Sequence, residues 1–259
     1  MKVLDEVGRD TEGVFEYAGG VAELGVDAFA YIVRLRVRVR ETFDQMYFLG
    51  VNSWSIVILT SLFVGLVLSL ESAQQAVSYG VSNLVGGAVT YGAARELGPL
   101  LTAIVVAGRV GAAIAAELGS MVVTEQVEAL QSLGLSPTRM LVVPRLVALL
   151  VMLPLLIVLA DVVSISGGAW MAQAYAHISY TSFIESARET VSFDDFIKGI
   201  SKGFVFATII ALIGSYQGLG TRGGAAGVGR STTDAVVNAI ILIFIANFAL
   251  SYVLFGGGR

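Results

Sequence analysis

The sequence predicts an all-α polytopic membrane protein with about five transmembrane helices. Hydrophobic residues make up 56% of the 259 positions and charged residues only 14%, whereas soluble domains contain roughly 25% charged residues. Several apolar runs are also long enough to cross a hydrocarbon core of about 30 Å, which takes roughly 20 helical residues. These runs lie at 54–77, 97–123, 140–166, 204–219 and 235–255, and the fourth is the shortest.

Residues 1–53 are predicted to form a cytoplasmic and interfacial helical segment, and residues 54–259 a transmembrane domain. The first residues carry acids throughout and lack the basic start and continuous apolar core of a signal peptide. Residues 30–50 mix arginines with large apolar side chains, which favours a helix lying among lipid headgroups. The alternation in "RLRVRVR" also fits a strand, but a single strand at a membrane edge leaves its backbone unpaired, so we favour the helix.

Charge placement predicts the orientation of the chain. Basic residues concentrate before the first span, and the positive-inside rule places that end in the cytoplasm. Five crossings then place the C-terminus on the opposite side, outside the cytoplasm. Segments 124–140 and 220–234 are expected in the cytoplasm, and segments 78–96 and 176–203 outside. Arg95, Arg188, Lys198 and Lys202 oppose this orientation, but the N-terminal basic cluster usually dominates.

Residues 84–94, "LVGGAVTYGAA", are apolar but only half as long as a span, and their glycines are expected to interrupt a regular helix. We therefore predict a re-entrant or outer-leaflet segment. In the span that follows, Ala107, Gly111, Ala115 and Gly119 recur every four residues and place small side chains on one helix face. That face suits either packing within the chain or contact with a second copy.

The polar stretch "TEQVEALQSLG", residues 124–134, is predicted to be a separate short helix, because Thr124 can cap its start and Gly134 can end it. Its apolar and polar residues fall on different sides. A plain connector needs only a few residues, so we expect a cytoplasmic docking element. Its candidate contact residues are Glu125, Gln126, Val127, Glu128, Leu130 and Leu133.

Arg109 lies near the middle of the second span, where an ionisable group is costly unless it finds a partner or water. Glu71, Glu117 and Asp161 are acids at similar depth. Two interpretations remain open at this point. Arg109, Glu117 and Asp161 can form a structural intramembrane ion pair, or Arg109 can act directly in transport.

The motif "GAAGVGRS", residues 224–231, matches the phosphate-binding pattern G-x-x-x-x-G-K-[ST] except that Arg230 replaces the lysine. It connects two membrane spans, whereas a phosphate loop follows a strand, so we expect no nucleotide or other cofactor on this chain. Cysteine is absent and His177 is the only histidine, so we expect no metal site and no enzymatic activity.

Two stretches carry a family resemblance: "RELGPLLTAIVVAGRVGAAIAAELGSMVVTEQVEALQSLGLSPTRMLVVPR" and "GGAAGVGRSTTDAVV". They resemble the characteristic regions of the MlaE/YrbE family of ABC-transporter permeases, and the similarity extends over almost the whole chain. The resemblance implies a homodimeric permease of the bacterial inner membrane that moves lipids, phospholipids above all, between that membrane and the periplasm or outer membrane. It implies a separate ATP-binding cassette ATPase, which would hold ATP and Mg, and a periplasmic MCE-domain protein. Residues 124–134 correspond to the family's coupling helix.

The resemblance also implies a lipid cavity at the dimer interface on the outer side, at Leu68, Glu71, Gln75, Tyr79, Arg95, Glu96 and Leu97. Glu71 departs from the neutral amide that often stands there, so the class of lipid stays open. Arg95 can grip a phosphate with two hydrogen bonds, or it can pair with Glu96 at the helix start. The competing function is a proton-coupled secondary transporter of an amphiphile that uses Glu71, Arg109 and Asp161. Neither function calls for a nucleic-acid partner.

Overall fold

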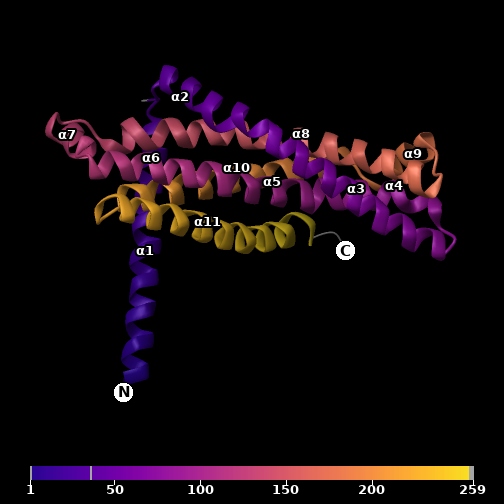
Figure 1. Ribbon diagram of the computed structural model, residues 1–259, viewed down its shortest axis with the longest axis horizontal. Coiled ribbons are helices and arrows are strands. Elements are labelled where there is room, and N and C mark those ends of the chain that lie inside the picture. The colour runs from indigo at the N-terminus through magenta and orange to yellow at the C-terminus, as the bar shows by residue number, and fades with distance from the viewer. Residues whose placement is uncertain (1, 36, 257–259) are drawn as a thin grey trace.

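The computed structural model describes residues 2–35 and 37–256, with side chains from residue 15 onward, and this part of the chain contains helices and no strand. Its helical runs Val39–Ser78, Ser82–Val123, Thr138–Ala176, Phe193–Leu219 and Gly224–Phe255 are each long and apolar enough to cross a membrane. They lie side by side along the long axis of the molecule, and successive runs point in opposite directions (Figure 1). The prediction of an all-α membrane protein with five spans is confirmed.

Helix α1 (Lys2–Val33) crosses one end of the bundle and points away from it (Figure 1). It is fixed there by Tyr17, whose ring packs edge-on against Tyr216 with 5.2 Å between centroids. The described residues of the stretch "RLRVRVR", 34–35 and 37–40, lie neither in a strand nor in one continuous helix. The chain turns at Leu35, whose φ is 52°, and Arg36 lies outside the described residues.

Helix α2 (Val39–Gln45) continues through a π-helical turn (Met46–Gly50) and a 3-10 turn (Val51–Ser53) into α3 (Trp54–Ser78). The predicted boundary between residues 53 and 54 therefore lies within one helical run. The second run is built the same way. Its parts are α4 (Val85–Gly92), a π-helical turn (Ala93–Leu97), α5 (Gly98–Val106), a second π-helical turn (Ala107–Gly111) and α6 (Ala112–Val123).

The segment predicted to be re-entrant or to lie in the outer leaflet contains α4, the first part of a continuous helical run, so it does not form a separate re-entrant loop. Its glycines do not interrupt the helix. Instead they let α9 (Tyr180–Thr190) approach closely. A Cβ at Gly86 would overlap the carbonyl oxygen of Phe183, and one at Gly87 would overlap the side chain of Thr190.

Helix α8 (Val143–Ala176), which follows the π-helical turn Thr138–Val142, packs against both α3 and α10 (Phe193–Leu219). At Gly65 the backbone of α3 lies against the carbonyl of Ser164 on α8. The small-residue face of the second run packs within the chain. Gly214 and Gly218 of α10 approach the backbone at Gly111 and Ala115.

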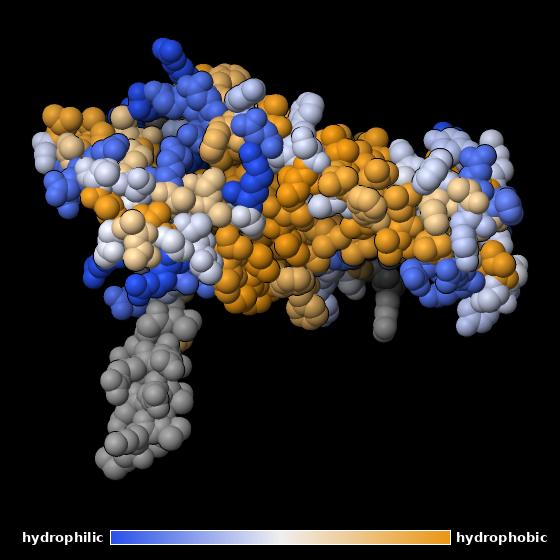
Figure 2. Space-filling model, viewed as in Figure 1, coloured by the Kyte–Doolittle hydropathy of each residue, from blue (hydrophilic) through white to orange (hydrophobic). Residues whose placement is uncertain are grey.

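The last span is α11 (Gly224–Phe255), which packs on α10 and α6. The short helix α7 (Gln126–Ser132) lies at one end of the bundle and α9 at the other (Figure 1), and we call these the α7 end and the α9 end. Figure 2 shows an apolar band between two hydrophilic ends. Large apolar side chains such as Phe63 on α3 and Phe248 on α11 are exposed in the spans. This surface matches a bilayer with water on both sides.

Candidate functional site

A charged cluster lies inside the bundle around Lys202 of α10, whose side chain is completely buried. A buried ammonium is costly unless its donors are satisfied, and here they are. Its Nζ lies 2.8 Å from the carbonyl oxygen of Arg95 and 3.0 Å from Oε1 of Glu96. It also lies 3.2 Å from Oδ1 of Asn247 and 2.8 Å from Oγ of Ser251. We call these five residues the Lys202 cluster.

The backbone explains why the cluster forms here. Arg95 and Glu96 lie in the π-helical turn Ala93–Leu97, where the i→i+5 pattern leaves backbone carbonyls open to other donors. Gly199, on the turn before Lys202, lets α10 approach this turn, because a Cβ there would overlap the carbonyl oxygen of Ala94. Lys202 is thereby brought within reach of the Arg95 carbonyl.

Helix α11 supplies the other half of the cluster. Asn247 and Ser251 are four residues apart and so share one helix face. Asn247 donates to Oε2 of Glu96 at 3.0 Å, and Ser251 donates to Oε1 at 2.7 Å. Both oxygens of the Glu96 carboxylate therefore have partners, and the second, fourth and fifth spans are joined at one point.

The guanidinium of Arg95 points to the edge of the cluster, beside a cavity of about 440 Å³. It lies 3.7 Å from the ring centroid of Phe255, contacts Tyr91, and has Asp195 at 3.6 Å. The last distance exceeds a hydrogen bond, so Asp195 does not occupy the Nε donor of Arg95, whereas Nη1 donates to the hydroxyl of Tyr91. The cavity is lined by Tyr91, Arg95, Glu96, Lys198, Leu254 and Phe255.

The residues predicted to bind substrate lie in separate places in the structure. Arg95 and Glu96 face α10 and α11, and the predicted pair between them is replaced by Arg95 with Asp195 and Glu96 with Lys202. Leu68 lies near Gly92 where α3 passes the second run. The remaining predicted residues, Glu71 and Gln75 of α3 and Tyr79 directly after it, are exposed. A single copy of the chain does not gather the whole set around one cavity.

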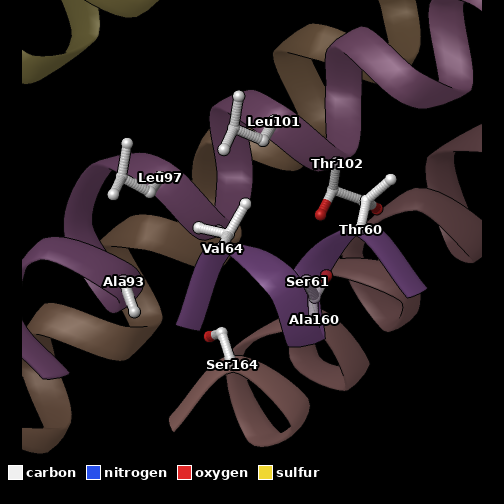
Figure 3. A pocket seen from close by; sticks show the side chains of 10 residues that line it. Thr60, Ser61, Val64, Ala93, Leu97, Leu101, Thr102, Ala160 and Ser164 are labelled. Atoms are coloured by element: carbon white, nitrogen blue, oxygen red, sulfur yellow. The ribbon is translucent and has the colours of Figure 1, made fainter. Parts of the chain in front are cut away.

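Leu97 lines a different and much smaller cavity, of about 10 Å³, between α3, α5 and α8. The side chains around it include hydroxyls from Thr60, Ser61, Thr102 and Ser164 (Figure 3). A space of this size holds about one water molecule. It is too small for an amphiphile.

The structure does not join Arg109, Glu117 and Asp161 in one ion pair. Arg109 donates to the hydroxyl oxygen of Ser53 at 2.6 Å. Glu117, about two helical turns further on, pairs with Arg145 of α8 at 2.8 Å. Asp161 lies beside Gly98, about three turns from Arg109 along the second run. A hydroxyl therefore takes the place of the predicted carboxylate partner.

Helix α7 lies within the segment 124–134, and its ends differ from the prediction in one respect. Gly134, with φ +72°, ends it as expected. Thr124 does not cap it, because its hydroxyl donates to the carbonyl of Ser120 at the end of α6. Glu125, with φ 60°, turns the chain between α6 and α7.

The faces of α7 define which residues a partner can reach. Val127 is 8% exposed and belongs to the core of the bundle, so it is not available as a contact. Leu130 is half-buried, and Leu133 is 75% exposed. We call the exposed set the α7 surface: Glu125, Gln126, Glu128 and Leu133.

Residues 224–231 form a helix and not a loop. Gly223 and Gly224 have positive φ and reverse the chain, and α11 begins at Gly224. Residues 224–231 therefore form its first turns. Ser231 lies within the helix, and its hydroxyl forms a hydrogen bond with the hydroxyl of Thr221 at 2.9 Å.

Sequence reasoning missed Lys202, Asn247, Ser251, Asp195 and Phe255. It began the fourth span at residue 204, which left Lys202 outside the membrane. A signal was present in the sequence, because Ser192 and Asp195 have the spacing of a capping box and form one. A helix that starts there runs through Lys202 into the apolar stretch.

Five antiparallel runs that are long and apolar enough to cross a membrane define a multi-pass membrane protein. A cavity beside a buried charged cluster and an exposed short helix at the α7 end are features that a transporter needs. The Permease MlaE family matches residues 42–253 of the chain, which belongs to this family. Its relatives place it among ABC-transporter permeases, as the resemblance noted in the sequence implies.

Three relatives illustrate the match. The chain is 43% identical over 229 residues to a probable ABC transporter permease protein of Synechocystis sp., covering 88% of this chain and 87% of that protein. It is 36% identical over 255 residues to a probable ABC transporter permease protein of Rickettsia typhi, covering 98% of each. It is 38% identical over 226 residues to Protein TRIGALACTOSYLDIACYLGLYCEROL 1, chloroplastic, of Arabidopsis thaliana, covering 87% of this chain and 65% of that protein.

Proposed function

We propose that the chain is the permease of an ABC transporter that moves lipids, most simply phospholipids, between the bacterial inner membrane and the periplasm or outer membrane. The observation that carries this proposal is the cavity beside Arg95, where a cation and the aromatic ring of Phe255 form a site with polar and apolar walls. Such a site suits the headgroup end of an amphiphile. One relative bears the name of a lipid, trigalactosyldiacylglycerol, which supports the same substrate class.

Arg95 is the residue we assign to headgroup binding. Its side chain is 15% exposed and its acid partner stands at 3.6 Å, so a phosphate can take the place of Asp195 and accept two hydrogen bonds. Lys198 lines the same cavity and adds positive charge. Lys202 and Glu96 have their partners within the cluster, so their part is to hold the 93–97 turn and aim Arg95 at the cavity.

The acyl chains would lie along α3. Leu68, Glu71, Gln75 and Tyr79 recur at three- and four-residue spacing, which places them on one face of the helix. In a homodimer that joins this face to the cavity beside Arg95, Leu68 and Leu97 supply apolar surface, and Glu71, Gln75 and Tyr79 line the mouth. The α9 end is then periplasmic and meets an MCE-domain protein, and the C-terminus of α11 lies on that side.

The energy would come from a separate ATPase that docks on the α7 surface. This places α7 and the N-terminus in the cytoplasm, and it leaves ATP and Mg on the partner with no cofactor on this chain. Family membership favours ATP over the proton-coupled alternative, and Glu71, Arg109 and Asp161 have no contact with one another in the described structure.

Photocrosslinking in cells tests this function. A photoreactive amino acid at Leu254 in the cavity, or at Tyr79 on the α3 face, should label radiolabelled phospholipid strongly. The control is Val151, an exposed residue of α8, which should label weakly because it meets only bulk bilayer. Equal labelling at all three positions would contradict a specific lipid cavity.

A further inference from the structure

Asp161 of α8 is a buried acid that the proposed function does not use. It is 3% exposed, and both of its carboxyl oxygens are buried without a hydrogen-bond partner. It lies well inside the span Thr138–Ala176, far from either end. In this respect it differs from Glu96, whose carboxylate accepts hydrogen bonds from three side chains.

The surroundings of Asp161 are apolar. Its Oδ1 lies against Gly98 of α5, where an added Cβ would overlap it. The hydroxyl of Ser164 donates to the backbone carbonyl of Asp161 at 3.1 Å and leaves the carboxyl group untouched. On its other side the residue borders a pocket of about 280 Å³. The other lining residues are Val158, Val162, Ile165, Ser166, Phe196 and Ile200.

The charged groups on the packed elements are engaged elsewhere. Helix α5 carries none, and the acid of α3, Glu71, is exposed. The charged side chains of the 93–97 turn and of α10 pair with one another and not with Asp161. The pairs are Arg95 with Asp195, Lys198 with Asp194, and Lys202 with Glu96.

An ionised carboxylate without donors is expensive in such surroundings, and a buried acid avoids that cost by taking up a proton. We propose that Asp161 is an intramembrane proton-binding site, a neutral carboxylic acid at neutral pH that reacts with a hydrophobic carbodiimide entering through the apolar pocket. The proton is resident in the conformation described. The proposal does not rest on the lipid-transport function and does not make the proton an energy source.

The carbodiimide reaction requires the protonated acid. The proton of Asp161 passes to one nitrogen of the reagent while a carboxyl oxygen bonds to its central carbon, giving an O-acylisourea. The acyl group then moves from that oxygen to the other nitrogen and gives a stable N-acylurea. No atom is lost, so the protein gains the full mass of the reagent.

Infrared difference spectroscopy tests the proton directly. The full chain in phospholipid vesicles at neutral pH is compared with Asp161→Asn, which keeps nearly the same size and is neutral. We expect the wild type to have a C=O stretching band of a protonated acid that the variant lacks. If the variant instead lacks a carboxylate band, Asp161 is ionised and the proposal is overturned.

Labelling of the wild-type protein gives a second test that does not depend on how the variant folds. Mass spectrometry of peptides should find a hydrophobic carbodiimide on Asp161 and should find no adduct there with a charged, water-soluble carbodiimide. Exposed Glu128 of α7 serves as the internal control for the water-soluble reagent. If the hydrophobic carbodiimide leaves Asp161 unmodified, or if the water-soluble reagent modifies it more, then Asp161 is not a protonated acid in apolar surroundings and the proposal is overturned.

Discussion

Lys202 occupies a place where a cation is tolerated only because four acceptors surround it. Replacing it with methionine keeps the size of the side chain but leaves the Glu96 carboxylate without its cation. The Lys202 side chain is fully buried but the Glu96 side chain is 40% exposed, so the cost should lie between the about 0–1 kcal/mol of an exposed pair and the about 3–5 kcal/mol of a fully buried one. We expect Lys202→Met to lower the midpoint of thermal unfolding in detergent and to reduce the amount of folded protein.

The control is Lys198→Met, four residues earlier on the same helix. Lys198 pairs with Asp194, and both side chains are substantially exposed, so the loss should be about 0–1 kcal/mol. The double variant Lys202→Met with Glu96→Gln should recover part of the stability, because it leaves no unpaired charge. Equal unfolding midpoints for the two lysine variants would show that the cluster does not stabilise the bundle.

These residues also show where sequence reasoning ends. Apolar runs and helix-capping patterns predict which segments cross the membrane, because burial in lipid depends on composition. Whether a lysine near the edge of a run faces water or a carboxylate inside the bundle depends on the neighbouring helices. Arg95 and Glu96 were recognised from their motif, whereas Asn247 and Ser251 were found only when α11 was seen to pack beside them.

At the scale of elements, the crossing of α3 and α8 depends on Gly65. A Cβ at this position would overlap the backbone carbonyl of Ser164, which cannot rotate away as a side chain can. We expect Gly65→Ala to cost about 1–3 kcal/mol through overpacking, measured as a lower midpoint of thermal unfolding. Gly229→Ala on α11 is the matched control. Nothing lies within 4 Å of its added Cβ, so stability should hold or rise slightly.

The path of the second run could not be predicted from glycine content alone. Gly86 and Gly87 indicated a break, because glycine weakens an isolated helix. In the folded chain the same residues make room for α9, and that packing keeps the helix continuous. A glycine in a sequence can mark either a break in a helix or a close contact between helices, and which of the two it marks depends on the neighbouring helix.

The whole molecule has two ends of different character, with α7 at one and α9 at the other (Figure 1). If the ATPase docks on the α7 surface, reversing charge there should disrupt the complex and the same change at the α9 end should not. We expect Glu125→Lys with Glu128→Lys to weaken copurification of the ATPase at least about tenfold, or roughly 1.4 kcal/mol. The reason is that the changed side chains face outward while Val127 still anchors the helix.

The matched control reverses two exposed acids on α9, Glu185→Lys with Glu189→Lys, which changes the net charge by the same amount. This variant should retain the ATPase and its stimulated hydrolysis, because α9 lies across the membrane from the docking surface in the proposed orientation. Loss of the ATPase from the α9 variant, with retention in the α7 variant, would reverse that orientation. Retention in both would show that α7 is a connector and that the ATPase binds elsewhere on the chain.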